Sequence, residues 1–121
     1  FFDNDVDSSC SMVIKYKNGV KAYLKSTLLE ETATEAIFHC ETGIIKINSR
    51  FHQPSTVTIF ANGKEVTKDF GCATIGYNYE VIHFNGLLRQ GKIQSDVMTY
   101  SFSNRLMKTL DKVSQIIGLE Y

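Results

Sequence analysis

The residues best suited to hold a small molecule are Tyr77, Asn78 and Tyr79, which stand where a helical pattern begins. Their rings can form an apolar wall, and their hydroxyl and amide groups can hydrogen-bond to the hydroxyls of a polyhydroxylated ligand. The alternative is that the tyrosines pack into a core. The sequence predicts substrate-binding residues at these three positions, with core packing as the alternative.

Metal and disulfide chemistry is not indicated. Glu80 and His83 have the spacing of di-iron helical bundles, but such a site requires a second pair and further carboxylates, which the sequence lacks. Cys10, Cys40 and Cys72 are about thirty residues apart and form no CxxC pair. We therefore expect no metal site and reduced thiols, as in a cytoplasmic protein.

Phosphate and dinucleotide binding are not indicated either. Gly71 and Gly76 have the spacing of a phosphate loop, but Tyr77 and Asn78 stand where Lys and Ser or Thr are needed. No GxGxxG is present, so the chain lacks a dinucleotide fingerprint. No Cys has a local pattern typical of a nucleophile. We expect no catalytic and no cofactor-binding residue in this chain.

The composition fits one soluble domain over residues 1–121. With 43% hydrophobic residues among 121, the chain is long enough to bury about 65% of its unfolded surface in a core. Thirteen basic residues balance thirteen acidic ones and neither sign forms a run, so we expect no nucleic-acid and no membrane partner. No apolar run approaches the roughly 20 residues of a membrane span.

Six segments alternate between apolar and polar residues, as strands with one wet face do. Asn18-Gly19 joins the first two and tolerates the positive φ values of a type I′ turn, and Asn62-Gly63 joins the last two. Because the connections are short, the strands should form an antiparallel meander. The segments are residues 10–16, 20–28, 36–40, 44–47, 56–60 and 65–70.

Two amphipathic helical patterns follow, within residues 76–121. The first has an apolar stripe through Val81 and Leu88 and ends before Gly91. The second begins with Ser101 as its expected cap and ends at Gly118. Strands first and helices last predict an α+β fold, an open and mostly antiparallel sheet of about six strands with two C-terminal helices packed on one face.

The other face of this sheet has no layer to cover it. Val13, Tyr23 and Phe60 are expected there. An uncovered sheet face with aromatic and β-branched residues usually contacts another protein surface. The sequence therefore predicts a homo-oligomer, a dimer in the simplest case, formed through the open sheet face.

The closing residues resemble the C-terminal domain of the glucose-fructose oxidoreductase and inositol dehydrogenase family, also called Gfo/Idh/MocA. The resemblance is strongest to members similar to dihydrodiol and xylose dehydrogenases. Upstream segments such as Tyr16-Lys17-Asn18-Gly19 also look like the family's strands and hairpins. The closing positions are Tyr79, Glu80, Leu88, Gly91, Lys92, Ser95, Met98, Leu110, Asp111, Val113, Gly118 and Tyr121.

The resemblance implies a two-domain enzyme in which an N-terminal Rossmann domain binds NAD or NADP. Hydride moves there between the nicotinamide and a carbinol carbon of a sugar or cyclitol. The family's catalytic Lys, Asp and His precede the region matched here, so no catalytic residue is carried over. On this reading the chain binds no cofactor itself, contributes dimer contacts and part of the substrate pocket, and is inactive alone. The alternative is a free-standing α+β module that binds a small ligand or dimerises.

Overall fold

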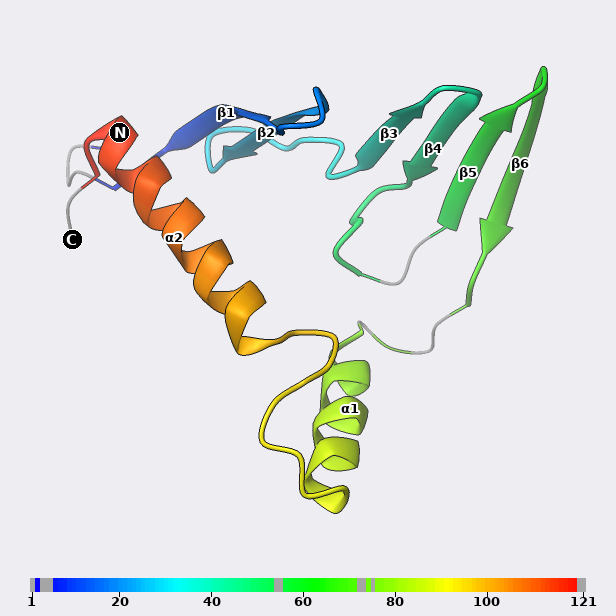
Figure 1. Cartoon of the computed structure of the whole chain (residues 1–121). Helices are drawn as coiled ribbons and strands as arrows, with labels where there is room; N and C mark the ends of the chain where they lie inside the picture. Colours follow the sequence, from blue (N-terminus) through cyan, green and yellow to red (C-terminus); the bar gives the residue numbers. More distant parts are fainter. Residues whose placement is uncertain (1, 3–5, 54–55, 72–73, 75, 120–121) are drawn as a thin grey trace. The chain divides into compact units, whose positions relative to one another are not determined.

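The computed structural model describes residues 2, 6–53, 56–71, 74 and 76–119. Across these residues six strands precede two helices (Figure 1). The strands are β1 (Ser9–Lys15), β2 (Lys21–Thr27), β3 (Ala36–Cys40), β4 (Gly43–Ile47), β5 (Thr56–Ala61) and β6 (Lys64–Asp69), and the helices are α1 (Tyr77–Arg89) and α2 (Tyr100–Ile117). The predicted α+β class and the six strand segments are confirmed.

The chain divides into two compact units. One comprises residues 1–32 and 98–121, with β1, β2 and α2, and the other comprises residues 33–97, with β3 to β6 and α1. All described strand pairs are antiparallel, but they form a two-stranded sheet, β1-β2, and a four-stranded meander, β3-β4-β5-β6. A polar segment separates β2 from β3, and Thr34 within it has a left-handed φ of 48°. The packing of both helices on one sheet face stays a prediction.

The two faces of the four-stranded sheet differ in chemistry. Because successive side chains in a strand point to opposite faces, the register assigns each residue to a face. On one face a single cross-strand row is apolar from edge to edge: Phe38, Ile45, Ile59 and Val66. On the other face the matching row becomes polar: Ile37, Lys46, Thr58 and Thr67.

A hydrogen-bonded ladder crosses the polar face. The Asn48 side-chain amide donates to Thr56 Oγ1 at 2.7 Å and to Thr58 Oγ1 at 3.0 Å, and the hydroxyls of Thr58 and Thr67 lie 2.9 Å apart. Among the described residues Thr58 alone is buried, with 5% of its surface exposed. A buried hydroxyl needs partners, and the ladder supplies them.

The two Asn-Gly turns differ. Asn62 and Gly63 both have positive φ, 52° and 69°, and join Ala61 to Lys64 as a two-residue type I′ turn. At the first hairpin only Gly19 has a positive φ, 86°, and its N–H donates to Tyr16 O at 3.0 Å. The type I′ prediction is wrong there, because a three-residue loop with Gly19 as a bulge joins the strands.

Gly43 permits the close approach of β4 to β5. It pairs with Ala61, and a Cβ at this position would stand 2.2 Å from the Phe60 carbonyl oxygen. No side chain fits at that distance. The sheet therefore requires glycine here for space, not for an unusual φ.

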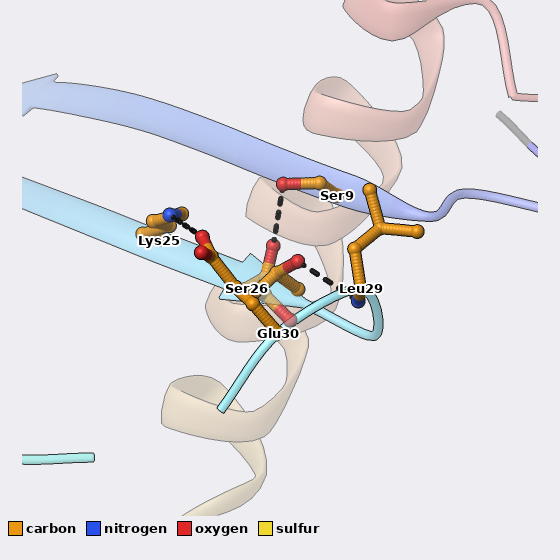
Figure 2. Close-up of polar contacts among 6 residues, drawn as sticks. Ser9, Lys25, Ser26, Leu29 and Glu30 are labelled. Atoms are coloured by element: carbon orange, nitrogen blue, oxygen red, sulfur yellow. Dashed lines mark hydrogen bonds and ion pairs between the residues drawn. The ribbon is translucent and has the colours of Figure 1, made fainter. Parts of the chain in front are cut away.

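Polar contacts mark the open end of the β1-β2 hairpin (Figure 2). The Ser9 hydroxyl donates to Ser26 O at 3.3 Å, and Lys25 forms an ion pair with Glu30. The hydrogen bond from Lys25 and its charge lower the pKa of Glu30. These contacts are exposed, so they contribute little to stability.

Both helices end at glycines in the left-handed region, as predicted. Gly91 has φ 64°, and the Lys92 N–H donates to Leu87 O at 3.0 Å, which pairs a carbonyl of the last turn. Gly118 has φ 71°, and the Leu119 N–H donates to Ser114 O at 2.9 Å. Each helix therefore stops within two residues of its glycine.

The cap of α2 differs from the prediction. Thr99, with extended φ and ψ of −70° and 156°, precedes the helix, and its hydroxyl accepts the Phe102 N–H at 3.2 Å. Ser101 lies inside the first turn and is not the cap. A cap needs non-helical backbone angles three residues before the N–H it receives, and Thr99 has both.

No hydrophobic side chain among the described residues is buried. The core expected from length and composition is therefore not formed by these residues. The close contacts between elements are those of neighbouring strands, and a strand pair buries its apolar side chains only against another layer. The apolar rows and stripes are a surface that requires a covering layer.

Candidate functional site

The predicted site lies at the first turn of α1. Gly76, with φ 101°, precedes the helix, and the Tyr79 N–H donates to Gly76 O at 3.0 Å. The Thr74 hydroxyl accepts the Gly76 N–H at 3.3 Å and donates to Asn78 Oδ1. Asn78 is thus held by the segment that leads into the helix, and ligand binding by its side chain stays a prediction.

Tyr77 and Tyr79 point to different sides of α1, because residues two apart on a helix do not share a face. Tyr77 lies on the stripe of Val81 and Leu88, whereas Tyr79 lies one turn before His83. The two rings are 67% and 55% exposed. The helix geometry therefore places Tyr77 on the apolar side of α1 and Tyr79 on the side of His83, and both core packing and ligand binding stay predictions.

His83 contacts a residue that is distant in sequence. Its Nε2 lies 2.8 Å from Ser95 Oγ, and both residues are half-buried. Ser95 Oγ also accepts the Val97 N–H at 3.0 Å, and Lys92 forms an ion pair with Asp96 at 3.2 Å. The segment after α1 is thereby tied back to the helix through one imidazole.

Charge around this contact is uneven. The hydrogen bond from Lys92 is the largest cause of the lowered pKa of Asp96, followed by a backbone hydrogen bond and the charge of Lys92, with a small contribution from His83. Asp96 is therefore ionised under ordinary conditions and places a negative charge near the imidazole.

Local sequence reasoning did not find the pairing of His83 with Ser95. The Glu80-x-x-His83 spacing drew attention to metal binding, but the imidazole contacts a serine twelve residues further on. No periodicity connects positions 83 and 95. The one available signal was that Ser95 belongs to the closing pattern of the Gfo/Idh/MocA family.

Within the described ranges, no group of three or more His, Cys, Asp or Glu side chains lies close enough to bind a metal. Cys10 and Cys40 are free thiols, and Cys72 lies outside the described residues. Of the glycine-spaced segment 71–76, residues 72, 73 and 75 also lie outside them.

Two surface hollows among the described residues border strands. One of about 480 Å³ spans the ends of β4, β5 and β6 beside Gly43 and Phe60. Another, of about 240 Å³, is lined by Asp7, Cys10 and Ile117 together with Ser9 and Ser11. Neither includes a cluster of ionisable groups arranged for proton transfer. These two hollows therefore indicate surfaces for packing.

Two curated proteins are similar to this chain over almost its whole length. The trans-1,2-dihydrobenzene-1,2-diol dehydrogenase of Xenopus tropicalis is 28% identical over 98% of the chain, and that of Xenopus laevis is 26% identical over 98%. The match covers the C-terminal part of these dehydrogenases. The resemblance to the C-terminal domain of the Gfo/Idh/MocA family is thereby confirmed.

The chain spans 38% of the length of each of these relatives. No protein-family model matches it, and no solved structure matches it significantly. In the part of the chain that the structure describes, neither helix has the length and apolar character needed to cross a membrane.

Proposed function

We propose that this chain is the C-terminal domain of an NAD- or NADP-dependent oxidoreductase that acts on a sugar, a cyclitol or a related diol. Its similarity over 98% of its length to the C-terminal part of two dihydrodiol dehydrogenases carries the proposal. A Rossmann domain outside these 121 residues holds the cofactor and the catalytic groups. This chain supplies one wall of the substrate pocket and the contacts of a cytoplasmic homodimer, and it is inactive alone.

The absence of a dinucleotide fingerprint supports this division of labour. The sequence contains no GxGxxG, the glycine pattern that lets a backbone approach the pyrophosphate of a dinucleotide. The cofactor therefore supplies the hydride chemistry in another domain. In this chain Asn78 and Tyr79 orient substrate hydroxyls by hydrogen bonding, and they exclude water from the reacting carbon.

The exposed apolar surface also supports a domain that works inside a larger protein. Across the described residues every strand and helix exposes apolar side chains, and no hydrophobic side chain is buried. A monomeric domain rarely exposes such continuous patches. The row from Phe38 to Val66 and the α2 stripe of Phe102, Leu106 and Leu110 are surfaces that other layers of the enzyme cover.

A binding measurement on the isolated chain tests the cofactor assignment. NADH should cause neither fluorescence quenching nor a thermal shift, because the dinucleotide site lies elsewhere. A chimera that joins the N-terminal part of the Xenopus tropicalis dehydrogenase to this chain should oxidise a diol, and removal of this chain should abolish that activity. Tight NADH binding by the isolated chain would contradict the proposal.

The gene offers an inexpensive test between the enzyme domain and a free-standing module. An upstream reading frame that encodes GxGxxG after a first strand supports the enzyme. A start codon directly before Phe1 supports the module. In that case the chain would need a ligand or partner of its own.

The proposed dimer surface is the hairpin face that carries Val13 and Tyr23, and Phe60 of the four-stranded sheet is a separate exposed position. Val13 and Tyr23 are direct cross-strand neighbours and are 52% and 74% exposed. Aromatic residues of this kind dominate the binding energy of protein interfaces. A second copy of the chain presents the same face, as a two-fold dimer requires.

Light scattering at several concentrations tests the dimer. We expect a dimer or a larger assembly, and Tyr23→Lys should shift it toward monomer by introducing a buried charge. Tyr16→Lys is the matched control. Tyr16 lies just beyond the end of β1, and the alternation of side chains assigns it to the face opposite Val13 and Tyr23. A strictly monomeric wild-type chain at high concentration would contradict this interface.

A further inference from the structure

The two edges of the four-stranded sheet differ in charge (Figure 1). At one edge β6 has charged side chains at four of its six positions: Lys64, Glu65, Lys68 and Asp69. At the other edge β3, with the sequence Ala-Ile-Phe-His-Cys, contains no Asp, Glu, Lys or Arg. Both strands of the hairpin, which are edge strands too, carry lysines. Among the described edge strands, β3 alone is therefore without such a charge.

An uncharged edge strand can accept a further strand. Alternate residues of an edge strand direct their N–H and C=O groups away from the sheet, and charged side chains are what usually keeps other strands from pairing there. Ile37 and Phe38 of β3 are 47% and 52% exposed. Glu35, just before the strand, forms an ion pair with Lys46 of β4 at 2.6 Å, so its charge is drawn onto the sheet. β3 therefore lacks the usual protection of an edge.

The charges of β6 exclude a second copy of the same strand. Two copies related by a two-fold axis run antiparallel and place residues of the same face opposite each other. The register with β5 assigns Lys64 and Lys68 to one face of β6 and Glu65 and Asp69 to the other. Every two-fold register of β6 therefore opposes like charges, which destabilises a strand pair.

A second copy of β3 meets no such repulsion. When Phe38 lies on the two-fold axis, all five residues of the strand pair with the other copy. The antiparallel direction of this pair continues that of every described pair in the sheet. The cross-strand pairs between the two copies are Phe38 with Phe38, Ala36 with Cys40, and Ile37 with His39.

This pairing also extends the apolar row of the sheet. Phe38 begins the row that continues through Ile45 and Ile59 to Val66. Two copies that meet at Phe38 join their rows into one continuous row. Opposed aromatic side chains also attract each other beyond the area that they bury. The edge that lacks charge is thus the edge where the apolar row ends in an aromatic ring.

We propose that β3 joins the four-stranded sheets of two copies of this chain edge to edge, through an antiparallel β3-β3 pair centred on Phe38. The pair ends at Ala36 and Cys40, because one residue further Glu35 would face Glu41. This contact is separate from the hairpin dimer and does not rest on the oxidoreductase function. Two different two-fold contacts on one chain give an assembly larger than a dimer.

Sedimentation of the full 121-residue chain with Tyr23→Lys tests this contact apart from the hairpin face. Because Tyr23→Lys weakens the hairpin dimer, the association that remains is that of β3. Adding Phe38→Lys should raise its dissociation constant about tenfold or more, since an aromatic pair is lost and two lysines oppose each other. Val66→Lys is the matched control and should leave the constant unchanged. Val66 lies at the other end of the same row and is 55% exposed, against 52% for Phe38.

A charge exchange at position 38 identifies the second copy as the partner. In the Tyr23→Lys chain, Phe38→Lys and Phe38→Glu should each give mainly monomers. An equimolar mixture of the two should form dimers, because Lys of one copy then faces Glu of the other. Association that returns on mixing also shows that both variants are folded.

Three results would refute the edge contact: a monomeric Tyr23→Lys chain at high concentration, equal weakening by Val66→Lys and Phe38→Lys, or a mixture that stays monomeric. The first result would leave a strand from the rest of the parent enzyme as the occupant of this edge. None of the three affects a wild-type dimer formed through the hairpin, so the two contacts are tested separately.

Discussion

The four-stranded sheet and the β1-β2 hairpin obey the same alternation of residues, yet they differ in what they enclose. The larger sheet places Thr58 on an inner strand between Lys46 and Thr67 and shields 95% of its surface. In the hairpin both strands are edge strands, and the hydrogen bond from Ser9 to the Ser26 carbonyl is exposed to solvent (Figure 2). Two strands specify a register, but an inner strand is needed before the sheet shields a side chain.

The largest effect is expected from Gly43→Ala. The added Cβ would stand 2.2 Å from the Phe60 carbonyl oxygen, so β4 and β5 must separate at that end. The free energy of unfolding, measured by urea denaturation, should fall by about 1–3 kcal/mol. Gly86→Ala is the control: a Cβ there meets nothing within 4 Å inside α1, so stability should rise by about 0.5–1 kcal/mol. Equal effects of both changes would contradict the close approach of the two strands.

Thr58→Val tests the ladder of the inner strand. Valine keeps the shape of threonine but loses the bonds to Asn48 and Thr67, so the free energy of unfolding should fall by about 1–2 kcal/mol. The hairpin counterpart, Ser9→Ala, removes an exposed hydrogen bond and should change the same quantity by less than about 0.5 kcal/mol. If the two variants cost the same, the difference between the sheets would not be one of burial.

Thr99→Ala tests the cap that begins α2. Loss of the hydroxyl that accepts the Phe102 N–H should cost about 1 kcal/mol and reduce helical ellipticity. Ser101→Ala should leave both quantities unchanged or slightly raised, since Ser101 lies inside the helix. The reverse ranking would restore Ser101 as the cap.

The smallest effect concerns one carboxylate in each unit. The pKa of Glu30 is lowered by Lys25 and that of Asp96 by Lys92. A lowered folded-state pKa gives stability that is present above the unfolded-state pKa, near 4, and that is lost as pH falls through the folded value. Carboxyl NMR titration should show Lys92→Met raising the pKa of Asp96 alone and Lys25→Met raising that of Glu30 alone. A change at the other unit's carboxylate would indicate coupling between the units.

Local rules predicted most of the secondary structure because they depend on neighbouring residues. Alternation located all six strands, and Gly91 and Gly118 located the helix ends. The Asn-Gly pairs show the limit of such rules: Asn62-Gly63 forms the expected turn, whereas Asn18-Gly19 does not. The same dipeptide can serve loops of two or three residues, and strand register decides between them.

The candidate site was less accessible to sequence reasoning. Tyr77, Asn78 and Tyr79 are adjacent in sequence, but the helix turns the two tyrosines to different sides. The contact between His83 and Ser95 depends on the path of the chain after Gly91, and no residue pattern announces it. The spacing of residues in the sequence describes a single helix or strand, whereas a binding site combines residues from several of them.

The sequence by itself determined the order of strands and helices, the ends of the helices and the similarity to a dehydrogenase's C-terminal part, because each of these depends on short-range pattern or on residue identity. The tertiary structure alone decided the division into two sheets, the burial of Thr58 and the contact between His83 and Ser95. These features arise where segments distant in the chain compete for the same space and the same hydrogen-bonding groups, and no local pattern encodes that competition.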